Sequence, residues 1–372
     1  MASATLSNAS FTNVSAGTPP GTVSTEYIRA TMLPNLTPYV QQWSVDLQRQ
    51  LPKDVVLDVA YSGSKGTHLI GIVDLDQAYP GVALAAGLHA ANGNTIFTTA
   101  DDPHINAVRP YLGYNAINAI ESAFDSNYHA LLVSLNKNFG AAGLISASYT
   151  YSKNLTDNAS DRSNAPQSTY NYHEGEYGQA TLDRQQVFNF NYVYTIPIFK
   201  SSKGALAYAM KGWEISGILS IYSGSPFTVT TSSVDPAGLG LLGNSASSSR
   251  PDMLCDPNAN APKLAPGFTG TGQPTWFNTA CFAAVPQGAI RPGNAGRGVV
   301  RGPGYGNLDG ALIKNFYFNE RASLQLRGEF FNATNHPNPN GFASTNITSS
   351  SFGQISSYRQ ARQVQIGAKF TF

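Results

Sequence analysis

The C-terminal stretch QVQIGAKFTF, residues 363–372, alternates between apolar and polar residues and ends on an aromatic residue. Side chains along an extended strand point alternately to its two faces. The apolar residues Val364, Ile366, Ala368, Phe370 and Phe372 are therefore expected on one face, opposite the polar set. Two architectures use such a strand: a soluble β-sandwich with this face in its core, or a transmembrane β-barrel with this face in lipid.

The composition favours the membrane alternative. Charged residues make up 12% of the 372 residues, about half of the roughly 25% that soluble domains carry, and aromatic residues reach 11%. Nucleic-acid-binding proteins usually carry a strongly basic face. The formal net charge here is only +1, which argues against a nucleic-acid partner. The chain has no uninterrupted apolar run approaching the roughly 18 residues of a membrane-spanning helix, so contact with a membrane is expected through strands.

Runs of period-two alternation predict nine strands. They lie at 39–50, from 55 onward, at 127–139, 144–154, 184–196, 211–224, 307–318 and 322–332, and from about 359 to the end. Several of these runs are near the 9–11 residues that an oblique bilayer crossing needs, whereas soluble strands usually stop at about five or six. The strands therefore have the length of membrane-spanning elements.

The connections between these strands alternate between short and long. Short links stand near 51–54, 140–143, 197–210 and 319–322, and long ones near 63–125, 155–183, 225–304 and 333–358. Outer-membrane barrels have short periplasmic turns and long extracellular loops, while compact soluble domains rarely carry several loops longer than about 15 residues. We predict an all-β, partial antiparallel transmembrane β-barrel over 39–372, preceded by an irregular segment at 1–38. The alternative is a secreted or surface β-sandwich that acts as an adhesion or interaction module.

Three motifs could suggest a ligand site, and each is weak. GLGLLG, residues 238–243, fits the dinucleotide fingerprint, but no strand precedes it and no helix follows it, so a flexible loop is expected. HEGE, residues 173–176, lacks the second His of a zinc motif. The stretch 293–304, with Arg297 and Arg301, lacks stacking aromatics for RNA and is expected to return toward the barrel wall. No catalytic, cofactor-binding or metal residue is predicted, and the chain is not expected to be an enzyme.

Cys255 and Cys281 lie in one stretch rich in Gly, Pro and Asn, and neither belongs to a CxxC motif. A disulfide between them fits an exported protein in an oxidising compartment. A pair of unlinked loop thiols is the alternative.

Several segments, in order along the chain, resemble the barrel region of Oar-type TonB-dependent receptors. They are TPYVQQWSVDLQRQLP (37–52), LDVAYSGSKGTHL (57–69), YHALLVSLNKNF (128–139), SYTYSKNLTD (148–157), GWEISGILSIYSGSPFTV (212–229), WFNTACFAAV (276–285) and FFNATNHPNPNGF (330–342). The resemblance implies a cell outer membrane transporter whose barrel has 22 strands around an N-terminal plug. It also implies energy coupling to TonB through that plug, and an extracellular ligand whose contact residues are not assigned.

The resemblance also bears on the two ends of the chain. No plug, TonB-binding segment or signal peptide is found in the sequence, so we expect the last nine strands of a larger receptor, as a fragment or a truncated reading frame. Phe370 and Phe372 resemble the terminal signal that the barrel assembly machinery recognises, and membership of the periplasmic aromatic girdle is compatible with that role. The expected partners are outer-membrane lipid, the assembly machinery and, only through the missing plug, TonB.

Overall fold

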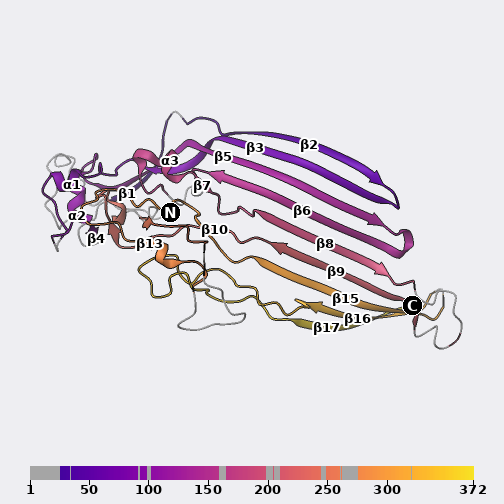
Figure 1. Cartoon of the computed structure of the whole chain (residues 1–372). Helices are drawn as coiled ribbons and strands as arrows, with labels where there is room; N and C mark the ends of the chain where they lie inside the picture. The colour runs from indigo at the N-terminus through magenta and orange to yellow at the C-terminus, as the bar shows by residue number, and fades with distance from the viewer. Residues whose placement is uncertain are drawn as a thin grey trace.

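The wall of the molecule is a single antiparallel sheet of nine long strands (Figure 1). The computed structural model describes residues 26–33, 35–90, 93–98, 102–158, 165–197, 204, 210–243, 249–259, 261, 275–319 and 321–372. The nine wall strands are β2 (Tyr39–Leu51), β3 (Val55–Asp74), β5 (Tyr114–Asn138), β6 (Gly143–Thr156), β8 (Gln186–Thr195), β9 (Trp213–Tyr222), β15 (Tyr305–Tyr317), β16 (Ser323–Phe331) and β17 (Gln363–Thr371). Wall strands that follow one another along the chain pair with each other, and β2 and β17 stand at the two edges.

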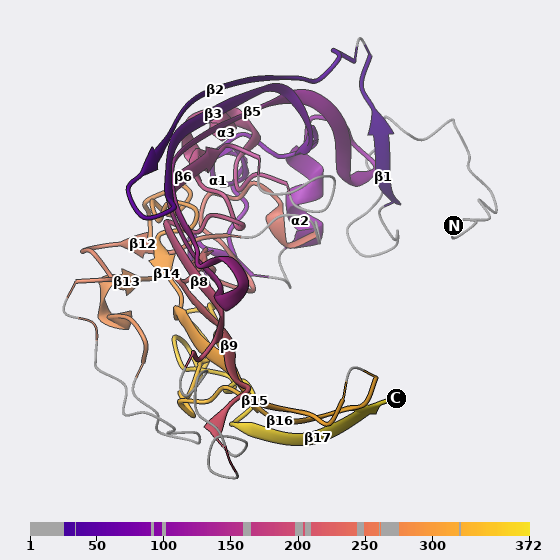
Figure 2. The ribbon, with the colours of Figure 1, turned by 90° about the vertical axis from the view of Figure 1, so that its right-hand side faces the viewer.

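The sheet is open. Viewed from one end, it bends into an arc whose first and last strands, β2 and β17, do not meet (Figure 2). The other sheets in the described part of the chain have two short strands each. The predicted partial antiparallel sheet of nine strands is therefore confirmed, and the β-sandwich alternative is wrong, because no second large sheet packs on the wall among these residues.

The pairing register keeps the two faces of the sheet distinct. One row of directly paired residues runs Leu47, Val59, Val133, Tyr149, Phe188 and Ile221 across β2 to β9. The next row runs Gln48, Asp58, Ser134, Ser148, Asn189 and Ser220. We call these the apolar face and the polar face. Because the side-chain period is two, a slip of one residue in any strand would exchange the faces, so the sequence specifies the register strongly.

Two strands are longer than the alternation predicts. β3 continues to Asp74 and β5 begins at Tyr114, so part of the loop expected at 63–125 is strand. The register shifts between Gly66 and Leu69, and beyond this irregularity Ile72 and Val73 are buried. Both faces of this part of the sheet are covered, so its sequence lacks alternation and was not recognisable as strand.

A further strand lies in the segment expected to be irregular. β1 (Glu26–Thr31) pairs in parallel with β5 from Tyr114 to Ile120. The described chain then crosses to β2, on the far side of β3. The rest of the predicted segment 1–38, residues 1–25 and 34, lies outside the described residues.

The long connections fold into an ordered layer at one end of the wall, which we call the cap (residues 75–113, 157–185, 223–304 and 332–362, as far as described). Its elements are α1 (Val82–Ala85), α2 (Asp102–Ile105), α3 (Tyr172–Glu176), β4 (Phe97–Thr98), β7 (Gly178–Gln179), β10 (Pro226–Phe227), β11 (Val234–Asp235), β12 (Asp252–Met253), β13 (Phe282–Ala283), β14 (Val300–Arg301), and 3-10 turns at Asn106–Val108, Thr169–Asn171, Leu241–Gly243 and Thr279–Cys281. Figure 1 shows α1, α2, α3, β4 and β13 gathered at this end. At the opposite end the turns are short, with a 3-10 turn at Gly140–Ala142 between β5 and β6.

The cap has its own apolar cores. One contains Val229, Phe277, Phe282 and Val300, against which Phe342 and other residues pack. A second contains Ala78, Ala83, Phe97 and Ile105. No helix among the described residues is long and apolar enough to cross a membrane.

Candidate functional site

The cap is tied together by buried polar groups that come from distant parts of the chain. Arg109 is 3% exposed. Its guanidinium donates hydrogen bonds of 2.7 Å to the backbone oxygens of Asp76 and Gly240 and to Oδ1 of Asn106. The backbone N–H of Gly240 in turn donates to Oδ2 of Asp235 at 2.6 Å. One arginine thereby joins the connection after β3 to the connection after β9.

Burial shifts the ionisation of carboxyl groups in this network. Burial raises the pKa of Asp76 to about 6; the neighbouring charge of Asp74 adds to the rise, and the N–H of Tyr111 and the charge of Arg109 oppose it. Burial also raises the pKa of Asp235, against hydrogen bonds from the backbone N–H groups that follow it. A charged carboxylate loses hydration on burial, so the protonated form is favoured.

The GLGLLG stretch is a packed turn rather than the flexible loop predicted for it. Leu239 is fully buried, and its backbone oxygen accepts a hydrogen bond from the N–H of Ala78. Gly240 has a φ of +81°, and a Cβ there would lie 2.5 Å from Cζ of Arg109. Glycine is therefore required at position 240, because a side chain there would collide with the buried guanidinium of Arg109. The two residues are far apart in the sequence, so no local pattern could have predicted this contact.

The HEGE motif divides between two partners. Nδ1 of His173 lies 2.7 Å from Oδ2 of Asp157, whereas Oε1 of Glu176 accepts from Nη2 of Arg250 at 2.7 Å. Arg250 and Glu176 are both almost fully buried. In the described part of the chain, no group of three or more His, Cys, Asp and Glu residues is arranged to hold a metal ion. The motif organises the cap around α3, and sequence reasoning missed Arg250 because its partner is far away along the chain.

The Arg/Gly stretch at 293–304 packs against the ends of wall strands. Arg297 donates to the backbone oxygen of Thr156 at the end of β6. Arg301 forms an ion pair with Asp183 and also donates to the backbone oxygen of Gly224. These arginines have structural partners in the cap and at the end of a wall strand, in keeping with the expected return of this loop to the wall.

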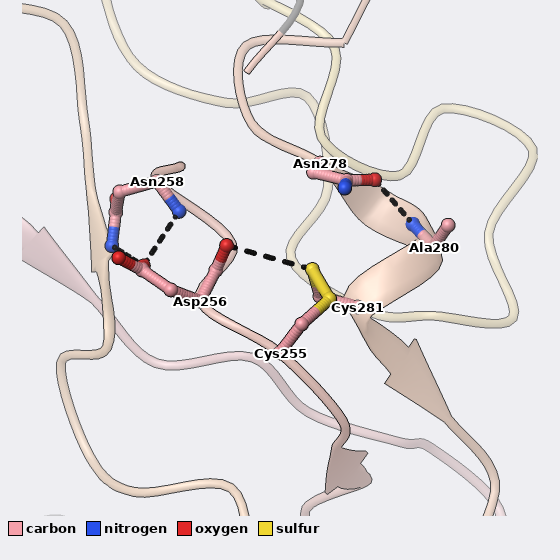
Figure 3. Close-up of a disulfide and its surroundings, with 6 residues drawn as sticks. All are labelled: Cys255, Asp256, Asn258, Asn278, Ala280 and Cys281. Atoms are coloured by element: carbon pink, nitrogen blue, oxygen red, sulfur yellow. Dashed lines mark hydrogen bonds between the residues drawn. A yellow bond between two sulfur atoms is a disulfide. The ribbon is translucent and has the colours of Figure 1, made fainter. Parts of the chain in front are cut away.

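Cys255 and Cys281 form a disulfide with their Cα atoms 4.9 Å apart (Figure 3). Cys281 is fully buried in the larger apolar core. The turn before it is capped by Asn278, whose Oδ1 accepts from the N–H of Ala280. The disulfide therefore joins the segment after β12 to the core that holds β13.

The terminal aromatic residues lie at the opposite end from the cap. Phe370 is 56% exposed and Phe372 is 94% exposed. The rings of Phe370 and Phe372 are 6.0 Å apart, and the ring of Phe370 is 6.4 Å from that of Phe318, which lies in the turn between β15 and β16. The structure brings these aromatics together at the rim of the apolar face.

Charges are distributed unequally over the wall. The register places the carboxylates Asp46, Asp58, Glu214, Asp309 and Glu329 on the polar face, together with Arg327 and Lys369. Arg49, Lys65, Lys137, Lys153 and Lys314 follow the apolar face, toward the strand ends. Two of these lysines lie over aromatic rings: Nζ of Lys137 is 4.9 Å from the ring centre of Phe139, and Nζ of Lys314 is 5.3 Å from that of Trp213.

An apolar face with cations and aromatics at its margins is the exterior of a membrane barrel. The family model described as "Outer membrane beta barrel domain" matches residues 2–365. The chain belongs to this family. An outer membrane beta barrel domain contacts lipid through its apolar face, and its long loops lie outside the cell. The localisation is therefore the outer membrane, and the loop lengths typical of such barrels assign the extracellular side to the end that carries the cap.

Solved structures of outer membrane proteins are similar at low identity. They include the outer membrane transporter YddB from Escherichia coli (9% identity, TM-score 0.46, covering 92% of this chain and 34% of that one). The ferripyoverdine receptor of the outer membrane of Pseudomonas aeruginosa is 10% identical (TM-score 0.39, 90% of this chain and 27% of that one). The toluene transporter TodX from Pseudomonas putida is 9% identical (TM-score 0.23, 90% and 61%). The chain thus spans about a third or less of the first two structures, and no curated protein matches it.

Proposed function

We propose that this chain is the C-terminal part of the barrel of an Oar-type TonB-dependent receptor, which binds or imports an extracellular ligand. The observation that carries the proposal is the open wall, whose edge strands β2 and β17 have no partner on their outer sides within the described sheet. Unpaired N–H and C=O groups are costly in lipid. Further strands would pair with these edges and close the barrel, as in the 22-stranded barrel that the resemblance implies.

Ligand binding is assigned to the cap and the polar face. The cap is ordered by buried contacts, so it presents a fixed surface to the outside rather than a set of loose loops. Such preorganisation lowers the entropy cost of binding. Energy coupling through TonB would require a plug, and no catalytic role is proposed.

The state of the polypeptide in isolated outer membranes tests this proposal. We expect it to resist a carbonate wash, to dissolve in detergent, and to have a mass above that of 372 residues, with peptides from a plug. Intact-mass and peptide mass spectrometry measure this directly. A membrane polypeptide of 372 residues with no plug peptide would contradict the receptor assignment.

We also propose that Phe372 is read by the barrel assembly machinery. Its ring is almost fully exposed, so Phe372→Ala removes little packing. The expected result is a marked loss of the protein from the outer membrane. Ile366→Ala is the matched control, because Ile366 is 85% exposed on the same face of β17 but is not terminal. Equal membrane levels of the two variants, measured by immunoblot, would assign Phe372 to the aromatic girdle alone.

A further inference from the structure

An apolar groove lies where the cap meets the apolar face of the wall. It has a volume of about 870 Å³, within the roughly 300–1,000 Å³ of ligand pockets. The residues that define it are Leu219, Ile221, Leu308, Trp276, Pro337 and Tyr358. The first three belong to β9 and β15, and the others belong to the cap. The groove is thus formed jointly by a membrane-spanning surface and an extracellular one.

The floor of the groove continues the lipid-facing surface. Leu219 pairs with Leu308, and Ile221 pairs with Gly306. In the same rows, Leu219 and Ile221 pair on their other side with Phe190 and Phe188 of β8. A hydrocarbon chain can therefore move along this face into the groove without crossing a polar surface.

The cap overhangs this floor. A Cβ on Gly306 would point to the apolar face, and its nearest contact would be the ring of His336 at 4.0 Å, so residues of the 332–362 connection stand on the outside of the wall. Viewed from one end, β12 and β13 also project beyond the convex side of the arc (Figure 2). Trp276 donates its indole N–H to the backbone oxygen of Arg301 at 2.9 Å, so the polar atom of this side chain is already bonded within the cap. Trp276 is half-buried, with part of its ring packed against the larger apolar core, and the rest of its hydrocarbon surface lines the groove.

We propose that the groove holds an acyl chain of an outer-leaflet lipid. Apolar surface at this depth is covered most favourably by hydrocarbon, because water would be ordered around it at a free-energy cost. The groove opens onto the established lipid contact and lies at the extracellular rim, where the outer leaflet ends. A bound chain would fasten the cap to the membrane at the junction of β9 and β15.

Fluorescence quenching of Trp276 by brominated acyl chains tests the proposal. Residues 1–372 contain three tryptophans. Trp43→Phe and Trp213→Phe, together with phenylalanine at every tryptophan of the larger receptor outside these residues, leave Trp276 as the single emitter. Protein purified from outer membranes is placed in mixed micelles with phosphatidylcholine that carries dibrominated stearoyl chains. We expect loss of most of the Trp276 emission, relative to unbrominated lipid. Emission that is insensitive to bromine would overturn the proposal.

Two variants separate the groove from general lipid contact. Gly306→Leu fills the groove from its floor, where a Cβ meets nothing closer than 4.0 Å, and should abolish most of the quenching. Gly328→Leu makes the same change on the apolar face of β16, where a Cβ lies 3.7 Å from Phe330, and should leave the quenching intact. Equal quenching in both variants would assign it to the bilayer at large and overturn the groove.

A measurement on the single-tryptophan protein needs no variant in the groove. Acrylamide in water should quench Trp276 weakly with phospholipid present and strongly after exchange into lipid-free short-chain detergent. Equal accessibility in the two states would overturn the proposal. Shielding that instead increases with protein concentration would identify a second copy of the chain as the occupant, which also contradicts a bound lipid.

Discussion

The carboxyl group of Asp76 shows how one buried residue makes the cap sensitive to pH. Oδ1 accepts a hydrogen bond from the N–H of Tyr111, and Oδ2 is buried without a hydrogen-bond partner. The pKa rises from an ordinary value of 3.8 to about 6. A raised pKa means that this group stabilises the fold fully below pH 3.8, and that the contribution is lost as the pH rises through about 6.

Asp76→Asn should therefore remove part of the pH dependence of the cap. The amide keeps the acceptor for Tyr111 and cannot ionise. In the unmodified protein we expect hydrogen exchange in residues 75–113, corrected for intrinsic rates, to become faster between pH 4 and pH 6. The variant should change less over this range, with the remainder due in part to Asp235, whose pKa is also raised. Identical pH profiles for the two proteins would contradict this role of Asp76.

The Cys255–Cys281 disulfide constrains a second region of the cap. The two residues are 26 positions apart, and closing a loop of this length stabilises a fold by about 3.5 kcal/mol in the chain-entropy account. Replacing both cysteines by alanine should increase the rate of proteolysis within residues 249–304 and leave the wall strands protected. Reduction of the unmodified protein should have the same effect. Wall and cap cleaved at equally increased rates would mean that the disulfide stabilises the whole barrel rather than this region.

At the scale of the strand, the two faces of β8 should differ in how well they tolerate a charged side chain. Phe190 lies on the apolar face, paired with Ala147 and Leu219, and Asn191 lies on the polar face. An arginine on the lipid face near the bilayer midplane costs about 2–4 kcal/mol. Phe190→Arg should therefore lower the amount of folded protein in the outer membrane sharply, and Asn191→Arg should lower it little. Heat-modifiable mobility on gels measures the folded fraction, and a reversed order would mean that the faces are wrongly assigned.

The same alternation explains which elements were predictable. All nine wall strands were found from the sequence, because a strand with one face in lipid and one in a polar interior repeats with period two. The outer halves of β3 and β5 were missed, because the cap covers both of their faces and removes the alternation. The order within the cap was missed as well, since Arg109 and Gly240, or Arg250 and Glu176, meet only through the folded wall.

At the scale of the whole molecule, the sequence predicted where the long connections lie but not that they fold into an ordered layer. Their composition predicts flexible loops, since Gly, Ser and Asn are frequent in them. The cap is instead packed around apolar cores and a buried ion pair between Arg250 and Glu176. The proposed lipid groove was predictable only in part. Its floor consists of apolar residues of β9 and β15, which follow the alternation, but its roof depends on how the cap folds back over the wall.

The edges of the wall lead to the last prediction. β2 is exposed along nearly its whole length, and β17 along most of its length. Each unpaired backbone group costs several kcal/mol in hydrocarbon, so in the outer membrane both edges should be paired with strands beyond this chain. We expect the amides on the outer edge of β2 to exchange with deuterium as slowly as those of β8, in protein extracted from outer membranes without unfolding. Fast exchange confined to the outer edges of β2 and β17 would mean that the wall remains open. Slow exchange in a particle containing two copies of the chain would mean that the edges close on each other, which contradicts a larger single barrel.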